Sequence, residues 1–228
     1  MLFMPELTKE QISARIAKNI AAMVNDVEHS YVLNLGVGIP TEVSNYVENE
    51  NVYIEAENGM LGVGPLAVGD QIHPMLCNAS RQPVVETSGC VYLDSTDSFG
   101  LIRGGYLNTT VLGAFEVDQE GNVANWIIPG GKQLGVGGAM DLVAGANRVI
   151  IAMTHCDKHG RPKLVKKCSL PVTARHEVDL VVTELGVFSF ENGRVILKSI
   201  APDTSIEYIQ EHTELDFEVD ASLTLMCS

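Results

Sequence analysis

The tripeptide Glu-Asn-Gly occurs twice in this chain, at Glu57 and again at Glu191. A glutamate beside glycine can act as a nucleophile on a loop with little side-chain bulk. Because a carboxylate is ordinarily ionised at neutral pH, such a nucleophile needs no general base. The same three residues are also typical of a tight turn. The flanking sequence must therefore decide which copy, if either, does chemistry.

The second copy lies within "GVFSFENGRVILKSI". Asn192-Gly193 stands between two runs of alternating apolar residues. This is the strongest short-range signal for a β-hairpin, because a type I′ turn needs positive φ at both central residues. We therefore expect Glu191 to be a solvated residue at the end of a strand, without a chemical role.

The first copy ends "NVYIEAENG", whose alternating apolar residues predict a buried strand. The segment that follows, "MLGVGPLAVGD", shows no returning strand, so we expect an irregular loop after Glu57. In an open α/β sheet, ligands collect outside the carboxyl ends of the strands. Glu57 is thus a candidate nucleophile. From physical chemistry alone, a loop glutamate that caps a helix or sits in water is an equal alternative.

Two glycine-rich segments are candidate sources of backbone amides. "LNLGVGIPT" does not complete a dinucleotide-binding fingerprint, because Thr41 stands where the third glycine would be. In "QLGVGGAMDL", the glycines from Gly135 to Gly138 run into a helix predicted to start near Ala139. The unpaired N–H groups of a helix N-terminus favour negative charge, as an oxyanion hole requires. The alternative is that these glycines only allow close packing against the sheet.

Two other groups of polar residues have weaker claims. Glu184 ends the predicted strand "VDLVVTE" without a following Asn-Gly, and we interpret it as structural, pairing with a nearby base. Four possible metal ligands lie close together in the sequence: His155, Cys156, His159 and Cys168. A tetrahedral zinc site would need a second close-spaced pair of ligands, and the sequence has none. We therefore expect no metal.

The elements that position these residues follow a β-turn-α-β order, which favours an α/β fold with an open, mostly parallel sheet flanked by helices. Thr8 and Gln11 form a capping box that starts a helix over residues 8–25. A turn and a helix follow the first strand, with Pro40 near the helix start. A second capping box is predicted at Thr204 and Glu207.

Strands are expected over residues 31–36, 51–59, 109–115, 148–154 and 178–184, and further helices over 95–101 and from about 139. No repeat, low-complexity tract or linker interrupts the pattern. The sequence therefore predicts a single domain over residues 1–228.

Composition excludes several classes of function. The chain has 15 basic and 29 acidic residues, a formal net charge of -14, which disfavours nucleic acid and anionic membranes as partners. Its five cysteines are odd in number and have no Cys-x-x-Cys spacing, as in cytosolic proteins with reduced thiols. No secretion signal or bilayer-spanning stretch is visible. We expect a cytoplasmic protein.

Seven motifs occur in order through nearly the whole chain: "LNLGVGIPT", "AENGMLGVGP", "FGLIRGG", "GNVANWIIPG", "GVGGAMDL", "VIIAMTHC" and "VTELGVF". With them the chain resembles the β subunit of a family I CoA-transferase of the 3-oxoacid (acetoacetate) type. The resemblance implies an open α/β fold of the sugar-phosphate-isomerase-like kind. It also implies that Glu57, in the (S/A)-E-N-G motif, is the covalent nucleophile; Ala56 stands where serine is common.

The resemblance further implies which residues surround Glu57. The backbone amides facing the reacting carbonyl would belong to Val37, Gly138 and Ala139. The residues supporting these loops would be Gly36, Gly38, Asn58 and Gly59.

The resemblance implies a complete mechanism as well. CoA would move between an acyl-CoA and a short-chain carboxylate such as acetoacetate, by ping-pong chemistry through a glutamyl-CoA thioester. CoA is then a carried substrate, and no cofactor is needed. The partner would be an α subunit, in an α₂β₂ heterotetramer.

Two other functions remain open. A sugar-phosphate isomerase of related fold would need Lys or Arg around a phosphate, and basic residues are sparse near the three loops. The other is a non-catalytic sensor of acyl-CoA or carboxylate. Glutamate rather than glutamine at position 57 argues against the sensor.

Overall fold

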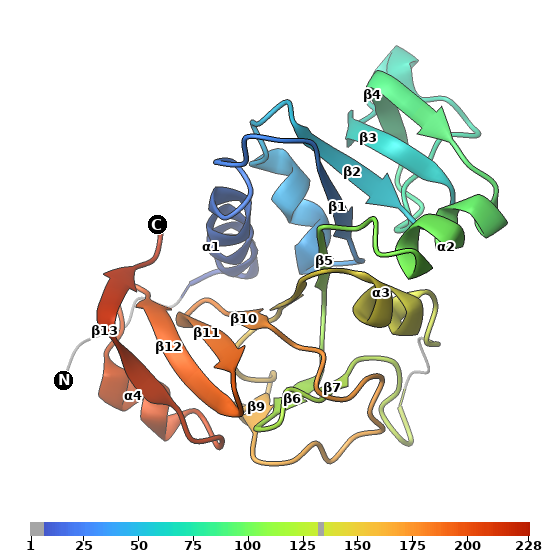
Figure 1. The fold of residues 1–228 in the computed structure, drawn as a ribbon. Helices are drawn as coiled ribbons and strands as arrows, with labels where there is room; N and C mark the ends of the chain where they lie inside the picture. The colour runs from blue at the N-terminus through green and yellow to red at the C-terminus, as the bar shows by residue number, and fades with distance from the viewer. Residues whose placement is uncertain (1–6, 132–134) are drawn as a thin grey trace.

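The computed structural model describes residues 7–131 and 135–228. Five strands form the parallel centre of an open sheet: β1 (Tyr31–Leu35), β2 (Val52–Ala56), β5 (Thr109–Leu112), β8 (Val149–Ala152) and β10 (Leu180–Val182). Their spatial order is β10-β8-β5-β1-β2, and each neighbouring pair is parallel (Figure 1). The predicted α/β fold with a mostly parallel open sheet is confirmed.

Antiparallel strands extend this centre on both sides to a ten-stranded sheet. The strands beyond β2 are β3 (Met60–Leu66) and β4 (Val84–Tyr92). Beyond β10 lie β11 (Gly186–Glu191), β12 (Arg194–Ile200) and β13 (Glu218–Leu225), the last of which runs parallel to β12. The single domain over residues 1–228 stays a prediction, and part of that range lies outside the described residues.

The prediction of an irregular loop after Glu57 is wrong. Ala56 pairs with Met60 in antiparallel register, so residues 57–59 form the turn of a hairpin between β2 and β3. The strand signal was weak because glycines replace the alternating side chains. These glycines lie under β4: a Cβ at Gly62 would be 2.9 Å from Cys90 Cα, and one at Gly64 would be 2.7 Å from Val85 O. Close backbone packing therefore requires glycine at these positions, and the alternation of apolar and polar side chains that identifies a strand is absent.

The hairpin predicted at the second Glu-Asn-Gly is confirmed. Asn192 and Gly193 have φ of 53° and 77°, the positive values that a type I′ turn demands. Glu191 pairs with Arg194 across the turn and is exposed. Both copies of the tripeptide therefore lie in β-hairpins, and only their surroundings differ.

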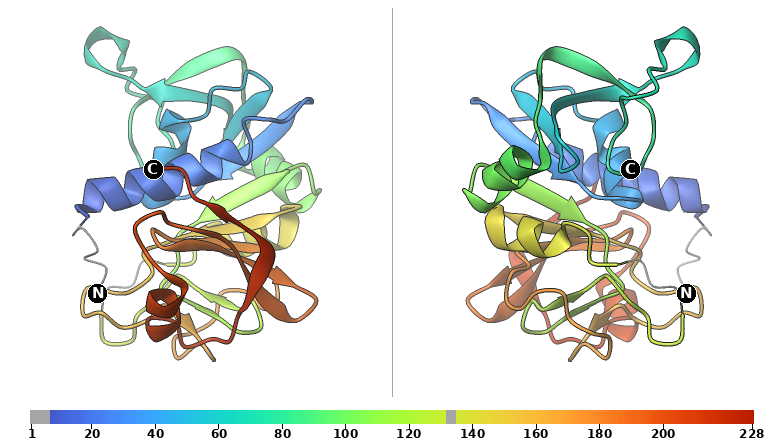
Figure 2. Two further views of the ribbon diagram at one scale, coloured as in Figure 1. Left: turned by 90° about the vertical axis from the view of Figure 1, so that its left-hand side faces the viewer. Right: turned by 90° about the vertical axis from the view of Figure 1, so that its right-hand side faces the viewer.

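One face of the sheet is covered by α1 (Lys9–Ala22) and a 3₁₀ helix, η1 (Ile39–Asn45). The predicted capping box at Thr8 and Gln11 is present and starts α1. The buried α1 side chains Ile16 and Ile20 pack with Leu33 of β1. In Figure 2, α1 crosses the sheet beside the C-terminal end of the chain.

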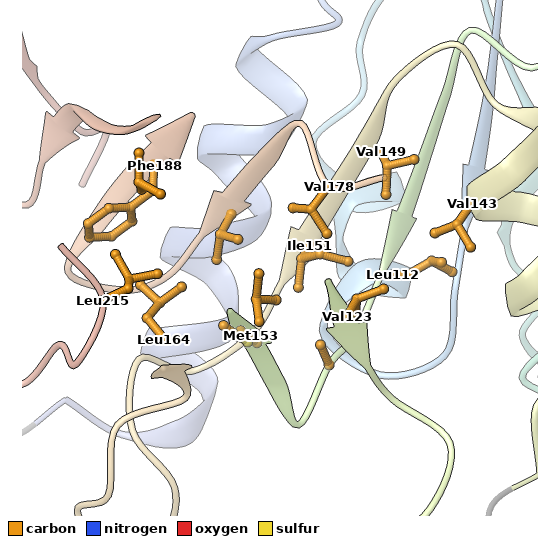
Figure 3. Packing of buried hydrophobic residues seen from close by; sticks show 14 of the residues in the cluster. Leu112, Val123, Val143, Val149, Ile151, Met153, Leu164, Val178, Phe188 and Leu215 are labelled. Carbon is orange, nitrogen blue, oxygen red and sulfur yellow. The ribbon is translucent and has the colours of Figure 1, made fainter. Parts of the chain in front are cut away.

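The opposite face is covered by α2 (Ser95–Arg103), α3 (Ala139–Gly145) and a small sheet of β6 (Glu116–Asp118), β7 (Val123–Ala124) and β9 (Leu164–Val165). Leu112 and Ile151 face this side, whereas their strand neighbours Val111 and Ile150 face α1. Figure 3 shows Leu112 and Ile151 within the core. Successive side chains of the central strands therefore pack into two hydrophobic cores, one on each face of the sheet.

Two short helices complete the chain, η2 (Gly69–Gln71) and α4 (Ile206–Glu211). The N-cap of α4 is Ser205, whose hydroxyl accepts from the Tyr208 N–H, so the capping box predicted at Thr204 and Glu207 is wrong by one residue. Two adjacent hydroxyl residues both fit the capping pattern, and only the backbone course selects between them. No helix in the described ranges has the length and apolar character needed to cross a membrane.

Candidate functional site

A cavity of about 660 Å³ opens at the carboxyl ends of four parallel strands. Glu57 follows β2, Val37 follows β1, Gly113 follows β5 and Met153 follows β8, and all four line the cavity. The chain passes from β1 to β2 on one side and later to β5 on the other. Ligands of open α/β sheets bind at such a switch point. The site is therefore where the order of the strands predicts it.

The turn that carries Glu57 is held by its two neighbours. Gly59 has φ of 119°, and a Cβ there would lie 2.2 Å from Leu93 O, so only glycine fits. The Gly59 N–H donates to Ala56 O at 2.9 Å. The Asn58 Nδ2 donates to Cys77 O at 2.9 Å and ties the turn to the segment after η2. Both residues fix the position from which Glu57, which is half-buried, reaches the cavity.

The segment at residues 36–38 follows β1 without a regular helix start. The Gly36 N–H donates to Val111 O at 2.9 Å, and a Cβ on Gly36 would lie 3.1 Å from that oxygen. Gly38 has φ of 94° and turns the chain into η1. The main-chain N–H of Val37 between them has no acceptor among the described residues. This amide is available to a ligand in the cavity.

The glycine run before α3 lies directly against Glu57. A Cβ on Gly138 would be 3.3 Å from Glu57 Cγ and 3.3 Å from Phe99 Cζ of α2. In the described residues the Gly138 N–H has no acceptor, whereas the Ala139 N–H donates to Val136 O at 3.1 Å. Of these two amides at the start of α3, that of Gly138 is the one available to a ligand.

Helix α2 supports the site from behind. The Ser98 hydroxyl donates to the main-chain oxygen of Glu57 at 2.9 Å. Arg103 pairs with Asp141 of α3 at 2.7 Å, and Figure 2 shows the two helices side by side. This ion pair is exposed and therefore weak. The contacts nevertheless link α2, α3 and the Glu57 turn into one assembly.

Sequence reasoning missed a buried polar cluster beside Glu57. It consists of Glu55, Asn34, Ser98 and Thr110, each with at most 1% of its surface exposed. The available signal was the polar residue inside each of the apolar strands "YVLNL" and "VYIEA". A polar residue at an inward strand position needs a hydrogen-bonding partner, and here the partners are one another.

Two basic residues that the sequence analysis passed over also line the cavity, Arg81 and Lys163. Arg81 lies in a turn with φ of 61°. Burial lowers the pKa of Lys163 to about 8, an effect opposed by the nearby Glu184 carboxylate. Lys163 is therefore mostly charged at neutral pH. Basic groups are few around the cavity, as expected, but these two can attract an anion.

Glu184 and His155, from the weaker candidates, make contacts within the core of the protein. Glu184 accepts a hydrogen bond from the His155 N–H at 2.9 Å. The His155 ring is buried between the hydroxyls of Thr183 and Thr213, and burial lowers its pKa to about 4. Within residues 7–131 and 135–228, no group of three His, Cys, Asp or Glu side chains is placed to hold a metal ion.

Comparison with known proteins supplies a family. Residues 17–212 match the family described as Coenzyme A transferase. The β subunit of acetate CoA-transferase from Escherichia coli K12 is 45% identical over 92% of this chain and 94% of its own length. One subunit of the succinyl-CoA:3-ketoacid coenzyme A transferase from Helicobacter pylori 26695 is 41% identical over 92% of this chain and 99% of its own.

Solved structures have the same fold at lower identity. The acyl-CoA transferase YdiF of Escherichia coli O157:H7 superposes with a TM-score of 0.76 at 21% identity, over 99% of this chain and 45% of that one. This chain thus spans about half of YdiF. The decarboxylase AibA/AibB gives a TM-score of 0.71 at 21% identity, over 94% and 88% of the two chains. A transferase and a decarboxylase give no support to the label sugar-phosphate-isomerase-like.

Proposed function

This chain belongs to the coenzyme A transferase family, as a β subunit, and we propose that Glu57 is the nucleophile of the enzyme. The position of Glu57 carries the proposal. Among the described residues that line the cavity it is the single carboxylate, and Gly138 at the start of α3 lies against it. A carboxylate beside unpaired amides, in a cavity, is the arrangement that acyl transfer needs.

In the proposed reaction a Glu57 carboxylate oxygen attacks the thioester carbonyl of an acyl-CoA. The tetrahedral intermediate loses CoA thiolate and leaves an acyl-glutamyl anhydride. The thiolate then adds to the side-chain carbonyl carbon of Glu57, expels the acyl group as a free carboxylate and leaves a glutamyl-CoA thioester. A second acid takes the CoA by the reverse steps, so the cycle consumes no proton or redox equivalent.

The surrounding residues would stabilise the charge that develops on the carbonyl oxygen. The N–H groups of Val37 and Gly138 are the donors we assign to this oxyanion, because neither has another acceptor among the described residues. The Ala139 N–H would have to break its hydrogen bond to Val136 O before it could donate to the oxyanion. The apolar side chains of Leu112, Phe115 and Met153 line the same cavity. Once the cavity is filled and closed they would exclude water, which strengthens these hydrogen bonds.

The substrates we propose are CoA thioesters and short-chain carboxylates. Arg81 and Lys163 bring positive charge to an otherwise largely apolar cavity, which suits a small anion. Acetoacetate with acetyl-, butyryl- or succinyl-CoA fits this description, and the relatives are named for acetate and for succinyl-CoA with 3-ketoacids. CoA is a substrate here, and no other cofactor is invoked.

An α subunit is the proposed partner, because each of the two relatives is named as one subunit of its enzyme. We propose an α₂β₂ heterotetramer located in the cytoplasm, the location that the odd number of cysteines suggests.

The main rivals are separated by covalent chemistry. The AibA/AibB decarboxylase has the same fold, so fold alone does not select the reaction. A sugar-phosphate isomerase would turn over its substrate without CoA. A sensor would bind acyl-CoA and release it unchanged. Only the transferase reaction places CoA on Glu57.

The experiment that tests this proposal is capture of the thioester. The complete complex of α and β subunits is incubated with acyl-CoA without an acceptor and quenched rapidly. The peptide that contains Glu57 should gain CoA, measured by mass spectrometry. Mild hydride reduction should convert the thioester to an alcohol and mark the same residue.

The two Glu-Asn-Gly copies offer a matched pair of variants. Glu57→Gln should abolish transfer, because an amide cannot form the anhydride. Glu191→Gln should leave transfer nearly unchanged and cost less than about 0.5 kcal/mol of stability, because Glu191 is exposed. CoA found on Glu191 or Glu184, or turnover by the Glu57→Gln enzyme, would show that Glu57 is not the nucleophile.

A further inference from the structure

A second carboxyl group lies two residues before Glu57 and has no part in the reaction above. Glu55, on β2, is only 1% exposed. Asn34 Nδ2 on β1 donates to Glu55 Oε2 at 2.8 Å, and Thr110 Oγ1 on β5 donates to Asn34 Oδ1 at 2.9 Å. On the other side, Ser98 Oγ of α2 lies 3.2 Å from Glu55 Oε1.

Ser98 connects Glu55 to the nucleophile's own backbone. Its hydroxyl lies 2.9 Å from the main-chain oxygen of Glu57. A hydroxyl has one proton, and a carbonyl oxygen can only accept. We place the Ser98 proton on the shorter of its two contacts, the one to the Glu57 carbonyl, so that Ser98 meets Glu55 Oε1 with a lone pair. That contact becomes a hydrogen bond only when Oε1 carries a proton.

The orientation of Asn34 supports the same assignment. Asn34 Nδ2 also lies 3.4 Å from the main-chain oxygen of Glu55, which can only accept, so the amide nitrogen is the end that faces Glu55. Glu55 Oε2 is then an acceptor. With a proton on Oε1, every member of the chain Thr110–Asn34–Glu55–Ser98–Glu57 has a donor facing an acceptor.

The charges around Glu55 favour its neutral form. The groups that face it from β1 and α2, Asn34 and Ser98, do not titrate, and its register partner on β3 is Leu61. Glu57 is the one charged group in the described residues that acts on it, and it opposes ionisation. Burial is the largest effect on the pKa of Glu55: it outweighs the hydrogen bond from Asn34, which lowers the pKa, and together with the repulsion from Glu57 it raises the pKa to about 7.

We propose that Glu55 is a positioning residue that acts in its protonated form, holding the main chain of the Glu57 turn through Ser98. This proposal rests on the proposed function of Glu57. Loss of the proton would draw the Ser98 hydroxyl proton towards the ionised Glu55 Oε1 and away from the Glu57 carbonyl, and it would put a second negative charge beside the nucleophile. The turn would then lose its anchor to α2, and the proposed anionic substrate would meet more repulsion.

The direction of the pH effect follows from the raised pKa. The protonated form is dominant below about pH 7 and is lost as the pH rises through that value. The rate of thioester formation by the wild-type complex should therefore fall about tenfold between about pH 6 and about pH 8. An ordinary glutamate would already be ionised throughout this range and would produce no such fall.

Two variants test the role of the proton. Glu55→Gln keeps the shape of the side chain, and its amide donates permanently to Ser98 while its oxygen accepts from Asn34. In Glu55→Met the side chain has a similar length but carries neither a hydrogen-bond donor for Ser98 nor an acceptor for Asn34. In the complete complex, Glu55→Met should lower thioester formation at least tenfold at every pH, as expected when a positioned reacting group is displaced. Glu55→Gln should restore the rate and remove the fall between about pH 6 and about pH 8.

A measurement without catalysis accompanies these rates. The infrared difference spectrum between wild type and Glu55→Gln should contain the carbonyl band of a protonated carboxyl at about pH 6, and this band should disappear as the pH rises through about 7. Absence of the band at about pH 6 would overturn the proposal.

The kinetic results separate this proposal from the one it rests on. Wild-type complex that forms no thioester at Glu57 at any pH would overturn the function of Glu57 itself. Thioester formation with the same pH dependence in wild type and Glu55→Gln would overturn only the role of Glu55. Full activity in Glu55→Met would do the same.

Discussion

At the level of single residues, Gly138 lies against Glu57, the proposed nucleophile. Gly138 has φ of -84°, a value that any residue adopts, so its backbone does not require glycine. The requirement is space, because a Cβ would lie 3.3 Å from both Glu57 Cγ and Phe99 Cζ. A side chain at position 138 would move the carboxylate or cover the amide beside it.

This contact makes Gly138→Ala an informative variant. We expect the complex to fold normally and to lose about a hundred- to a thousandfold in turnover, the typical effect of losing one oxyanion donor. The measurement is the steady-state rate, with thermal unfolding to confirm the fold. Gly100→Ala on α2 is the control, because a Cβ there meets nothing within 4 Å and should leave the rate unchanged. Equal rates for both variants would remove Gly138 from the site.

At the level of elements, two hairpins with the same tripeptide have different surroundings. The turn of β11 and β12 projects into open space, and a Cβ on Gly193 would meet nothing within 4 Å. The turn of β2 and β3 is pressed against the start of α2, where Leu93 N donates to Gly59 O at 2.9 Å. Packing of the turn, rather than its sequence, separates the proposed nucleophile Glu57 from the solvated Glu191.

The corresponding glycine-to-alanine variants should differ accordingly. Gly193→Ala adds only left-handed backbone strain and should cost about 1 kcal/mol of stability with activity retained. Gly59→Ala adds a clash with Leu93 O and should cost more than about 3 kcal/mol, with loss of thioester formation. Denaturant unfolding and thioester capture measure the two effects. Similar stability losses in both variants would contradict the packing argument.

At the level of the whole molecule, the chain corresponds to only part of one of the proteins that share its fold. It spans 45% of YdiF but 94% of the acetate CoA-transferase β subunit of Escherichia coli. The cavity around Glu57 is open to solvent in the isolated chain. We propose that the α subunit closes it. Exclusion of water is part of the proposed mechanism, so an open site should be inactive.

We therefore expect the purified chain to show negligible transfer between acetoacetate and acyl-CoA donors. Addition of the α subunit should restore activity in proportion to complex formation, followed by size-exclusion chromatography and a CoA-transfer assay. Heat-treated α subunit provides the control. Full activity from the chain alone would contradict the proposed division of the site between two subunits.

The sequence by itself determined the features that depend on a few neighbouring residues. The capping box at Thr8, the type I′ turn at Asn192-Gly193 and the parallel central strands follow from local hydrogen bonding and from side-chain periodicity. Its ordered motifs also sufficed to identify the family. Each of these patterns is written within a short window of the chain, where backbone preferences act directly.

Only the tertiary structure decided how the site is assembled. Gly62 carries no side chain, so the strand after Glu57 is visible only through its packing under β4. Likewise, the chain from Glu55 through Ser98 to Glu57 depends on where distant segments come to rest. The physical reason is that burial and close contact arise between residues far apart in sequence, which no local pattern records.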